Sequence, residues 1–200
     1  MAKAKKAKPV EPIIFPQQYM VVAADLSLKR PGFCKFIVSH IDNETKIESF
    51  ETMSVDNKTT VKSHGELLNE ILKAIVNFFP DPEKTPYPIY YVREQAINSR
   101  AAMSEIGIFK VVGVTEWYVY GLNNKWHEIY PVSVKKLVTG SGKADKDVVA
   151  KCLPYYFGEH TYANDDESDA AAVGAAFLVQ HEQMKSIASE TVKKEEMPVD

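Results

Sequence analysis

Hydrophobic and polar positions follow a strand pattern in the first third of the chain. Residues 19–25 form an almost continuous apolar run, which is typical of a strand buried on both faces of a sheet. Residues 32–41 and 46–55 predict two more strands, joined by a turn at Asp42 and Asn43. The chain is therefore expected to open with a three-stranded meander.

After the meander, helical and strand patterns alternate. Apolar residues at helical spacing predict a helix between residues 67 and 79, which prolines at 80, 82 and 86 end. The other expected elements are strands over residues 87–94 and 125–130 and helices over residues 98–120, 133–138, 145–155 and 164–179. This order predicts an α/β fold with a mixed five-stranded sheet flanked by helices.

Composition limits the class of protein. The chain has 200 residues, 45% of them hydrophobic, which suits one domain with a substantial core. We expect that domain over residues 18–183, between a disordered basic arm (1–17) and a charged, disordered tail (184–200). The net charge of −3 indicates no polyanion partner by itself, and no segment has the pattern of a secretory signal or a membrane span. Two distant cysteines, Cys34 and Cys152, are expected to be reduced thiols of a soluble intracellular protein.

The last predicted helix begins with a cluster of acids ahead of small apolar residues. Helix capping and the helix dipole account for Asp165 and Glu167, and we expect Asp165 to be the cap. They do not account for Asp169, which lies a turn inside the helix, where the apolar face has begun. Asp166 precedes Asp169 by three residues and shares the stripe of Ala170 and its successors. The spacing therefore predicts two carboxylates on the inward face.

Two more acids end predicted strands. Asp25 follows the apolar run at 19–25, and Glu94 ends the strand that begins near residue 87. A lone carboxylate at a strand end is usually solvated, but ligand sites of α/β sheets gather beyond the strand ends. Clustered carboxylates repel one another and need cations to stay ionised, and Mg²⁺ or Mn²⁺ prefers oxygen ligands. Such a site can activate a water molecule against a phosphodiester.

Four segments, in order and spread from about Tyr19 to Phe177, resemble the RuvC family of Holliday junction resolvases in the RNase H-like superfamily. They include a strand-one Asp followed by Pro-Gly-aromatic, a Pro-x-x-Val-Lys and Gly-x-Gly-x-Ala-x-Lys block, and a closing Asp-x-x-Asp-Ala. The segments are residues 22–28 with 31–33, 91–95, 130–136 with 140–146, and 166–170.

The resemblance implies an RNase H-like fold and a Mg²⁺-dependent endonuclease, with Mn²⁺ as a substitute. Its substrate would be four-way junctions and other branched DNA, cut by direct in-line attack of water to leave 5′-phosphate and 3′-hydroxyl ends. A homodimer would cut the two symmetric strands. The family's metal-binding acids match Asp25, Glu94, Asp166 and Asp169, and these acids together with Lys146 are the expected catalytic residues.

Basic residues of the third segment are the expected DNA contacts, with the lysines at 135 and 146 near the scissile phosphate by the resemblance. The full set is Lys135, Lys136, Lys143, Lys146, Ile97 and Arg100. Ile97 stands where the family often carries an aromatic residue that engages bases. The loop at 140–143 lacks P-loop spacing, so no nucleotide cofactor is expected. The expected location is the cytoplasm of a bacterium or of a phage-infected host.

Two alternatives stay open on the sequence alone. An RNase H-like nuclease could act on flaps, forks or hybrids instead of four-way junctions. A catalytically silent module could bind branched DNA without cutting it. The intact acids argue against the silent module, and the block at 130–146 favours the resolvase.

Overall fold

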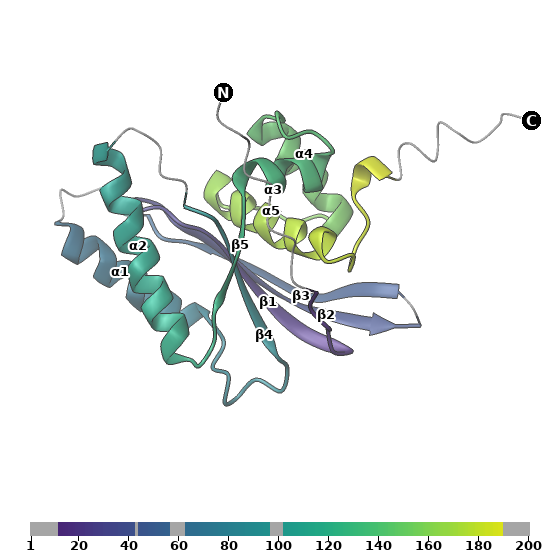
Figure 1. The fold of residues 1–200 in the computed structure, drawn as a ribbon, viewed down its shortest axis with the longest axis horizontal. Helices are drawn as coiled ribbons and strands as arrows, with labels where there is room; N and C mark the ends of the chain where they lie inside the picture. Colours follow the sequence, from purple (N-terminus) through teal and green to yellow (C-terminus); the bar gives the residue numbers. More distant parts are fainter. Residues whose placement is uncertain (1–11, 43, 57–62, 97–101, 190–200) are drawn as a thin grey trace, which may run out of the picture.

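A mixed five-stranded sheet forms the centre of the protein (Figure 1). The structure is a computed structural model that describes residues 12–42, 44–56, 63–96 and 102–189. The strand order is β3-β2-β1-β4-β5, with β1 antiparallel to β2 and β2 to β3, whereas β4 runs parallel to β1 and to β5. The strands are β1 (Gln18–Asp25), β2 (Gly32–Ile41), β3 (Glu44–Ser54), β4 (Ile89–Glu94) and β5 (Trp126–Ile129). The predicted meander and mixed sheet are confirmed.

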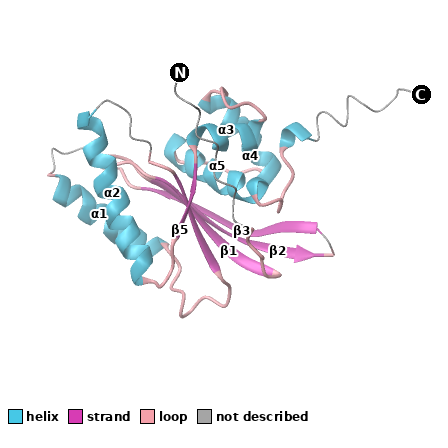
Figure 2. Ribbon diagram, viewed as in Figure 1, coloured by secondary structure: helices cyan, strands magenta, loops and turns pink. Residues whose placement is uncertain are grey.

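Helices cover the two faces of the sheet unequally (Figure 2). One face carries α1 (His64–Phe78) and α2 (Ala102–Gly121). The other carries α3 (Pro131–Thr139), α4 (Lys146–Phe157) and α5 (Asp165–Gln180). The predicted α/β arrangement, with helices flanking a mixed five-stranded sheet, is confirmed. Across the described ranges, no helix combines the length and apolarity that crossing a membrane requires.

The central strand β1 packs on both faces, as its apolar run predicts. Val21 and Ala23 belong to the core under α5, whereas Val22 and Ala24 belong to the core under α1 and α2. Small residues let α5 lie close to the sheet: a Cβ on Gly174 would be 2.7 Å from the Cε1 atom of Phe36. The helix that begins with acids is therefore the most deeply buried helix on its face.

Both ends of the described chain contact the domain. The ring of Phe15 lies 4.7 Å from that of Tyr19 and 5.8 Å from that of Phe177. Near the other end, Ser186 donates a hydrogen bond to the carbonyl of Leu137 at 2.8 Å. The predicted arm and tail stay predictions, because residues 1–11 and 190–200 lie outside the described residues.

Candidate active site

Asp25 and Glu94 lie side by side at one edge of the sheet. Each is the last residue of its strand, and β1 and β4 are parallel, with Ala24 opposite Arg93 in the register. Side chains alternate between faces along a strand. Val92 packs in the core under α5, so Glu94 shares its face, whereas Arg93 points to the face of α2. The strand ends therefore place two carboxylates under the start of α5.

The electrostatics of these two acids indicate a carboxylate cluster. Burial, with the neighbouring carboxylates of Asp169 and Asp166, raises the pKa of Asp25 to about 6, against the lowering effect of Lys146. Burial, with Asp25 and Asp169, raises the pKa of Glu94 to about 7, against the lowering effects of Lys146 and Lys135. Asp25 is thus within electrostatic reach of Glu94, Asp166 and Asp169, and Glu94 is within reach of Asp25 and Asp169.

The N-cap of α5 is Asn164, so the predicted cap role of Asp165 is wrong. The Asn164 Oδ1 atom accepts a hydrogen bond from the backbone N–H of Glu167 at 3.2 Å. Its Nδ2 atom donates to Ser54 Oγ at 2.7 Å. Asn164 has extended backbone angles, as a cap requires, while Asp165 is already the first helical residue and is exposed.

Glu167 is a buried carboxylate that the sequence analysis attributed only to the helix dipole. Its oxygens accept hydrogen bonds from Thr52 Oγ1 at 2.8 Å, from Ser54 Oγ at 3.1 Å and from the backbone N–H of Ala163 at 3.1 Å. Three bonds satisfy a charge that would otherwise be costly to bury. Glu167 thereby fixes the first turn of α5 to β3, which orients Asp166 and Asp169.

Gly32 allows the acidic turn to approach the sheet. A Cβ at this position would lie 1.9 Å from the carbonyl oxygen of Asp166 and 2.3 Å from its carbonyl carbon. No side chain fits at those distances. The Pro-Gly-aromatic motif after Asp25 therefore has a local reason: it makes room for the backbone of Asp166.

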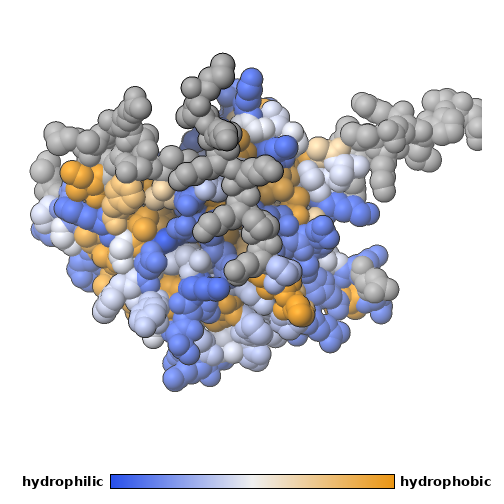
Figure 3. Space-filling model, viewed as in Figure 1, coloured by the Kyte–Doolittle hydropathy of each residue, from blue (hydrophilic) through white to orange (hydrophobic). Residues whose placement is uncertain are grey.

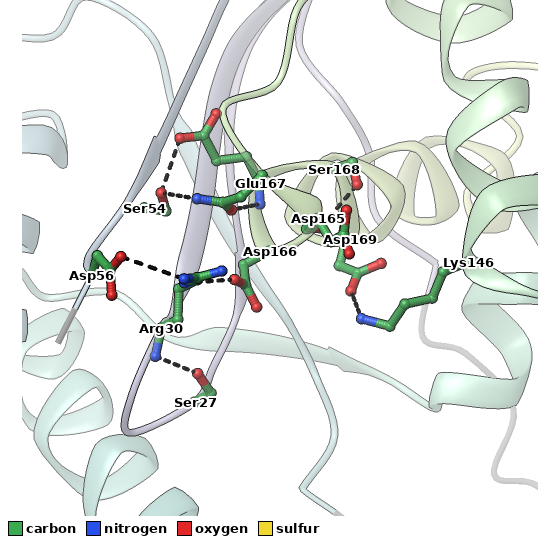
Figure 4. Close-up of polar contacts among 11 residues, drawn as sticks. Ser27, Arg30, Ser54, Asp56, Lys146, Asp165, Asp166, Glu167, Ser168 and Asp169 are labelled. Carbon is green, nitrogen blue, oxygen red and sulfur yellow. Dashed lines mark hydrogen bonds and ion pairs between the residues drawn. The ribbon is translucent and has the colours of Figure 1, made fainter. Parts of the chain in front are cut away.

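Two cations engage the acids of α5 (Figure 4). Lys146, the first residue of α4, forms an ion pair with Asp169, which raises the pKa of the lysine. Arg30 lies between Asp166 and Asp56, with Nε 3.5 Å from Asp166 Oδ2 and Nη2 3.4 Å from Asp56 Oδ2. Arg30 was not predicted from the sequence, because its only signal there is its place in the loop after Asp25.

The other predicted DNA contacts are spread around this edge. Lys135 donates a hydrogen bond to the carbonyl of Ala144 at 2.8 Å and lies near enough to Glu94 to oppose the rise of its pKa. Lys136 on α3 and Lys143 in the following loop are exposed. Ile97 and Arg100 lie outside the described residues.

The chemistry of the acids fits a divalent cation, although the side chains are not gathered around one. Within the described residues, no three His, Cys, Asp or Glu groups are arranged to hold an ion. Asp166 instead faces Arg30, and Asp169 faces Lys146. Four carboxylates, two with raised pKa values, form the all-oxygen donor set that a hard cation prefers.

Comparison with known proteins identifies the fold. No protein-family model matches the sequence, and no curated protein matches it either. The structure of Thermus thermophilus RuvC aligns with a TM-score of 0.57 and 15% identity, covering 82% of this chain and 96% of that one. T. thermophilus RuvC in complex with a Holliday junction substrate aligns with a TM-score of 0.56 and 16% identity, covering 79% and 92%. The chain therefore has the fold of the RuvC Holliday junction resolvase.

Proposed function

We propose that the protein is an endonuclease that cuts branched DNA, with four-way junctions as its principal substrate. The observation that supports the proposal is the position of Asp25 at a strand end of a RuvC fold, within electrostatic reach of Glu94, Asp166 and Asp169. One solved relative of that fold is bound to a Holliday junction, which supports the choice of substrate.

In the proposed reaction Asp25, Glu94, Asp166 and Asp169 would hold Mg²⁺, with Mn²⁺ as a substitute. A cation there would neutralise charge at the phosphate and lower the pKa of the attacking water. To hold the cation, Asp166 and Asp169 would have to release Arg30 and Lys146. Lys146 would then be available to face the phosphate whose charge increases in the transition state, while Arg30 would keep its contact with Asp56. Phosphate contacts by Lys135, Lys136 and Lys143 position the DNA backbone without reading its sequence.

Two strands of a four-way junction must be cut symmetrically, so we propose that the protein works as a homodimer with one site in each subunit. Each chain carries its own set of acids and lysines. Pairing two chains therefore brings two complete sites to one junction without sharing catalytic residues.

A cleavage panel tests this proposal. Labelled four-way junction, fork, flap, RNA–DNA hybrid and linear duplex are incubated with the protein, with Mg²⁺ or with EDTA. We expect paired nicks in the junction that require the metal and are absent with Asp25→Asn. Cleavage of the hybrid in preference to the junction would replace the resolvase with a hybrid nuclease. Junction binding without any cleavage would support a silent binding module.

A further inference from the structure

Arg30 lies between two carboxylates that come from distant parts of the chain (Figure 4). Its Nη2 atom donates a hydrogen bond to Asp56 Oδ2 at 3.4 Å, and its Nε atom lies 3.5 Å from Asp166 Oδ2. Asp56 lies two residues after the end of β3, whereas Asp166 belongs to the first turn of α5. One guanidinium group therefore joins a candidate metal ligand to an acid outside the cluster.

The backbone holds Arg30 and Asp56 opposite each other. The pairing of β2 with β3 continues past the strand ends, because the N–H of Val55 donates to the carbonyl of Pro31 at 3.1 Å. Arg30 and Asp56 are the next facing positions. The N–H of Arg30 also donates to Ser27 Oγ at 3.0 Å, which fixes the loop after β1. These contacts do not involve Asp166, so they persist when its side chain turns away.

The two contacts of the Arg30 side chain are unequal. The contact with Asp56 has the geometry of a hydrogen bond. At the other carboxylate, the Nε atom of Arg30 is buried and has no hydrogen-bond partner within the described ranges, so only charge attracts it to Asp166. A buried donor without a hydrogen bond adds little stability. Asp166 can therefore leave Arg30 more easily than Asp56 can.

Arg30 differs in this respect from Lys146, the cation that pairs with Asp169. The Lys146 side chain is 62% exposed, so water can solvate its ammonium group when Asp169 leaves it. The Arg30 side chain is only 25% exposed, and a guanidinium group stays charged at any ordinary pH. A charge that is mostly buried needs an acid beside it. Asp56 supplies that acid when Asp166 turns away.

The arrangement makes Arg30 a competitor of a divalent cation for Asp166. The carboxylate of Asp166 cannot face the guanidinium group and ligate a metal with the same oxygen. The apparent affinity for a ligand falls with the fraction of the protein that is competent to bind it. Arg30 lowers that fraction while it faces Asp166, and Asp56 raises the fraction by drawing Arg30 to itself.

We propose that Arg30 and Asp56 are positioning residues that set the metal affinity of the candidate site through Asp166. Without metal, Arg30 is shared between the two acids, and when a divalent cation binds, Arg30 stays with Asp56 alone. The inference rests on the proposed metal-dependent nuclease and deepens it. It gives a role in metal binding to two residues that are not themselves metal ligands.

Mn²⁺ binding to the DNA-free protein tests the proposal, with the electron paramagnetic resonance signal of free Mn²⁺ as the readout. Binding that is lost in Asp25→Asn is assigned to the site. Arg30→Met keeps the apolar stem and removes the charge, so Mn²⁺ should bind about three- to tenfold more tightly. Asp56→Ala leaves Arg30 with Asp166 alone, so Mn²⁺ should bind about two- to fivefold more weakly.

The double variant separates competition from simple addition of charges. Arg30→Met with Asp56→Ala should bind Mn²⁺ within about twofold of Arg30→Met, because Asp56 acts only through Arg30. Equal weakening by Asp56→Ala in both backgrounds overturns the proposal. The matched control is Lys29→Met, which removes an exposed cation one residue away and should change the affinity by less than about twofold. Tightening by Lys29→Met equal to that by Arg30→Met also overturns it.

Folding and the failure of the nuclease proposal are controlled separately. Circular dichroism melts check each variant, and the exposed position of Asp56 keeps Asp56→Ala informative even where Arg30→Met does not fold. An unchanged Mn²⁺ affinity in folded Asp56→Ala overturns the inference alone and leaves the cleavage panel as the test of the nuclease. Absence of Mn²⁺ binding in the wild type and in every variant overturns the metal site together with this inference.

Discussion

The helices α5 and α2 are both rich in apolar residues, but the chain covers only α5 on all sides. Residues 170–178 of α5 are buried between the sheet and the helices α3 and α4. On the opposite face of the sheet, α2 buries one side and exposes Trp117 and Tyr120 on the other. An apolar helix in this molecule is therefore either buried on all sides, as α5 is, or buried on one side and exposed on the other, as α2 is.

The side-chain sizes distinguish the two cases. In α5 the buried positions are mostly Ala, Gly and Val, because the helix must lie close enough to the sheet for its first turn to reach Asp25 and Glu94. In α2 the exposed positions include large apolar side chains, among them Phe109, Trp117 and Tyr120. Orange surface is visible over the side of the molecule occupied by α1 and α2 (Figure 3). Small residues let α5 pack within the chain, whereas these large side chains of α2 stay uncovered in the described part of the chain.

The largest effects are expected where α5 meets the strand ends. Asp25→Asn, Glu94→Gln and Asp166→Asn should each lower single-turnover cleavage of a four-way junction by about 10²–10³-fold or more, the scale seen when a transition-state interaction is removed. Junction binding should be retained or strengthened, because loss of a carboxylate reduces repulsion of phosphate. Cleavage gels and binding assays with the same DNA measure both quantities.

The matched control for these acids is a carboxylate on the opposite face of the sheet from α5. Glu70 on α1 is a solvent-facing carboxylate that pairs with Lys73 at 3.3 Å. Glu70→Gln should leave cleavage unchanged. A variant of Asp25, Glu94 or Asp166 that cuts as fast as Glu70→Gln would remove that residue from the site.

The elements of the fold were predictable from the sequence because each depends on a local hydrophobic period. The strand β2 was predicted with its observed bounds, Gly32–Ile41, and the apolar run at β1 predicted its central place in the sheet. Element ends were less accurate: α3 begins at Pro131 and not at residue 133. Proline is favoured in the first turn of a helix, so Pro131 marks the start of α3 as well as the end of the strand before it.

The candidate site was only partly predictable, because some of its parts depend on contacts between distant segments. The spacing of Asp166 and Asp169 predicted their shared face. Nothing local indicates that Glu167 is bound by Thr52 and Ser54, more than 110 residues away. The same is true of Arg30, which reaches Asp166 only because the loop after β1 lies under α5.

Two glycines sharpen the comparison between the helices. Gly174→Ala should cost about 1–3 kcal/mol of unfolding free energy, because its methyl group would press on the Phe36 ring at 2.7 Å. Gly113→Ala should instead stabilise the monomer by up to about 1 kcal/mol, since Ala favours a helix and nothing lies within 4 Å. Urea unfolding at low protein concentration measures both. Equal destabilisation by the two substitutions would contradict the difference in packing.

The pH dependence of stability probes the acid cluster without DNA. The pKa values of Asp25 and Glu94 rise on folding from 3.8 and 4.5 to about 6 and about 7. A carboxyl whose pKa is raised in the folded state binds its proton more tightly there than in the unfolded state. Its contribution to the free energy of unfolding is therefore present at low pH and is lost as the pH rises from the unfolded pKa through the folded pKa. In EDTA, the free energy of unfolding of Asp25→Asn should therefore match that of the wild type near pH 4 and exceed it by roughly 3 kcal/mol near pH 8.

Repeating the stability measurement with Mg²⁺ tests whether the pH effect comes from the acid cluster. The buried His127, with a pKa lowered to about 4, has the opposite pH dependence, but it is common to both proteins and cancels in their difference. Mg²⁺ should raise the melting temperature of the wild type at pH 8 and have much less effect on Asp25→Asn. A stability difference that stays constant from pH 4 to pH 8 would show that Asp25 is not part of a repelling cluster.

The smallest effect separates the cap of α5 from its neighbour. Asn164→Ala should cost about 1 kcal/mol, because it removes the acceptor for the Glu167 N–H and the donor to Ser54. Asp165→Ala should cost only a few tenths of a kcal/mol, since the side chain is exposed and contributes mainly through the helix dipole. Thermal melts of both variants, with cleavage rates measured alongside, test the assignment. Asp165→Ala should cut within a few-fold of wild type, and a larger stability loss for Asp165→Ala than for Asn164→Ala would return the cap to Asp165.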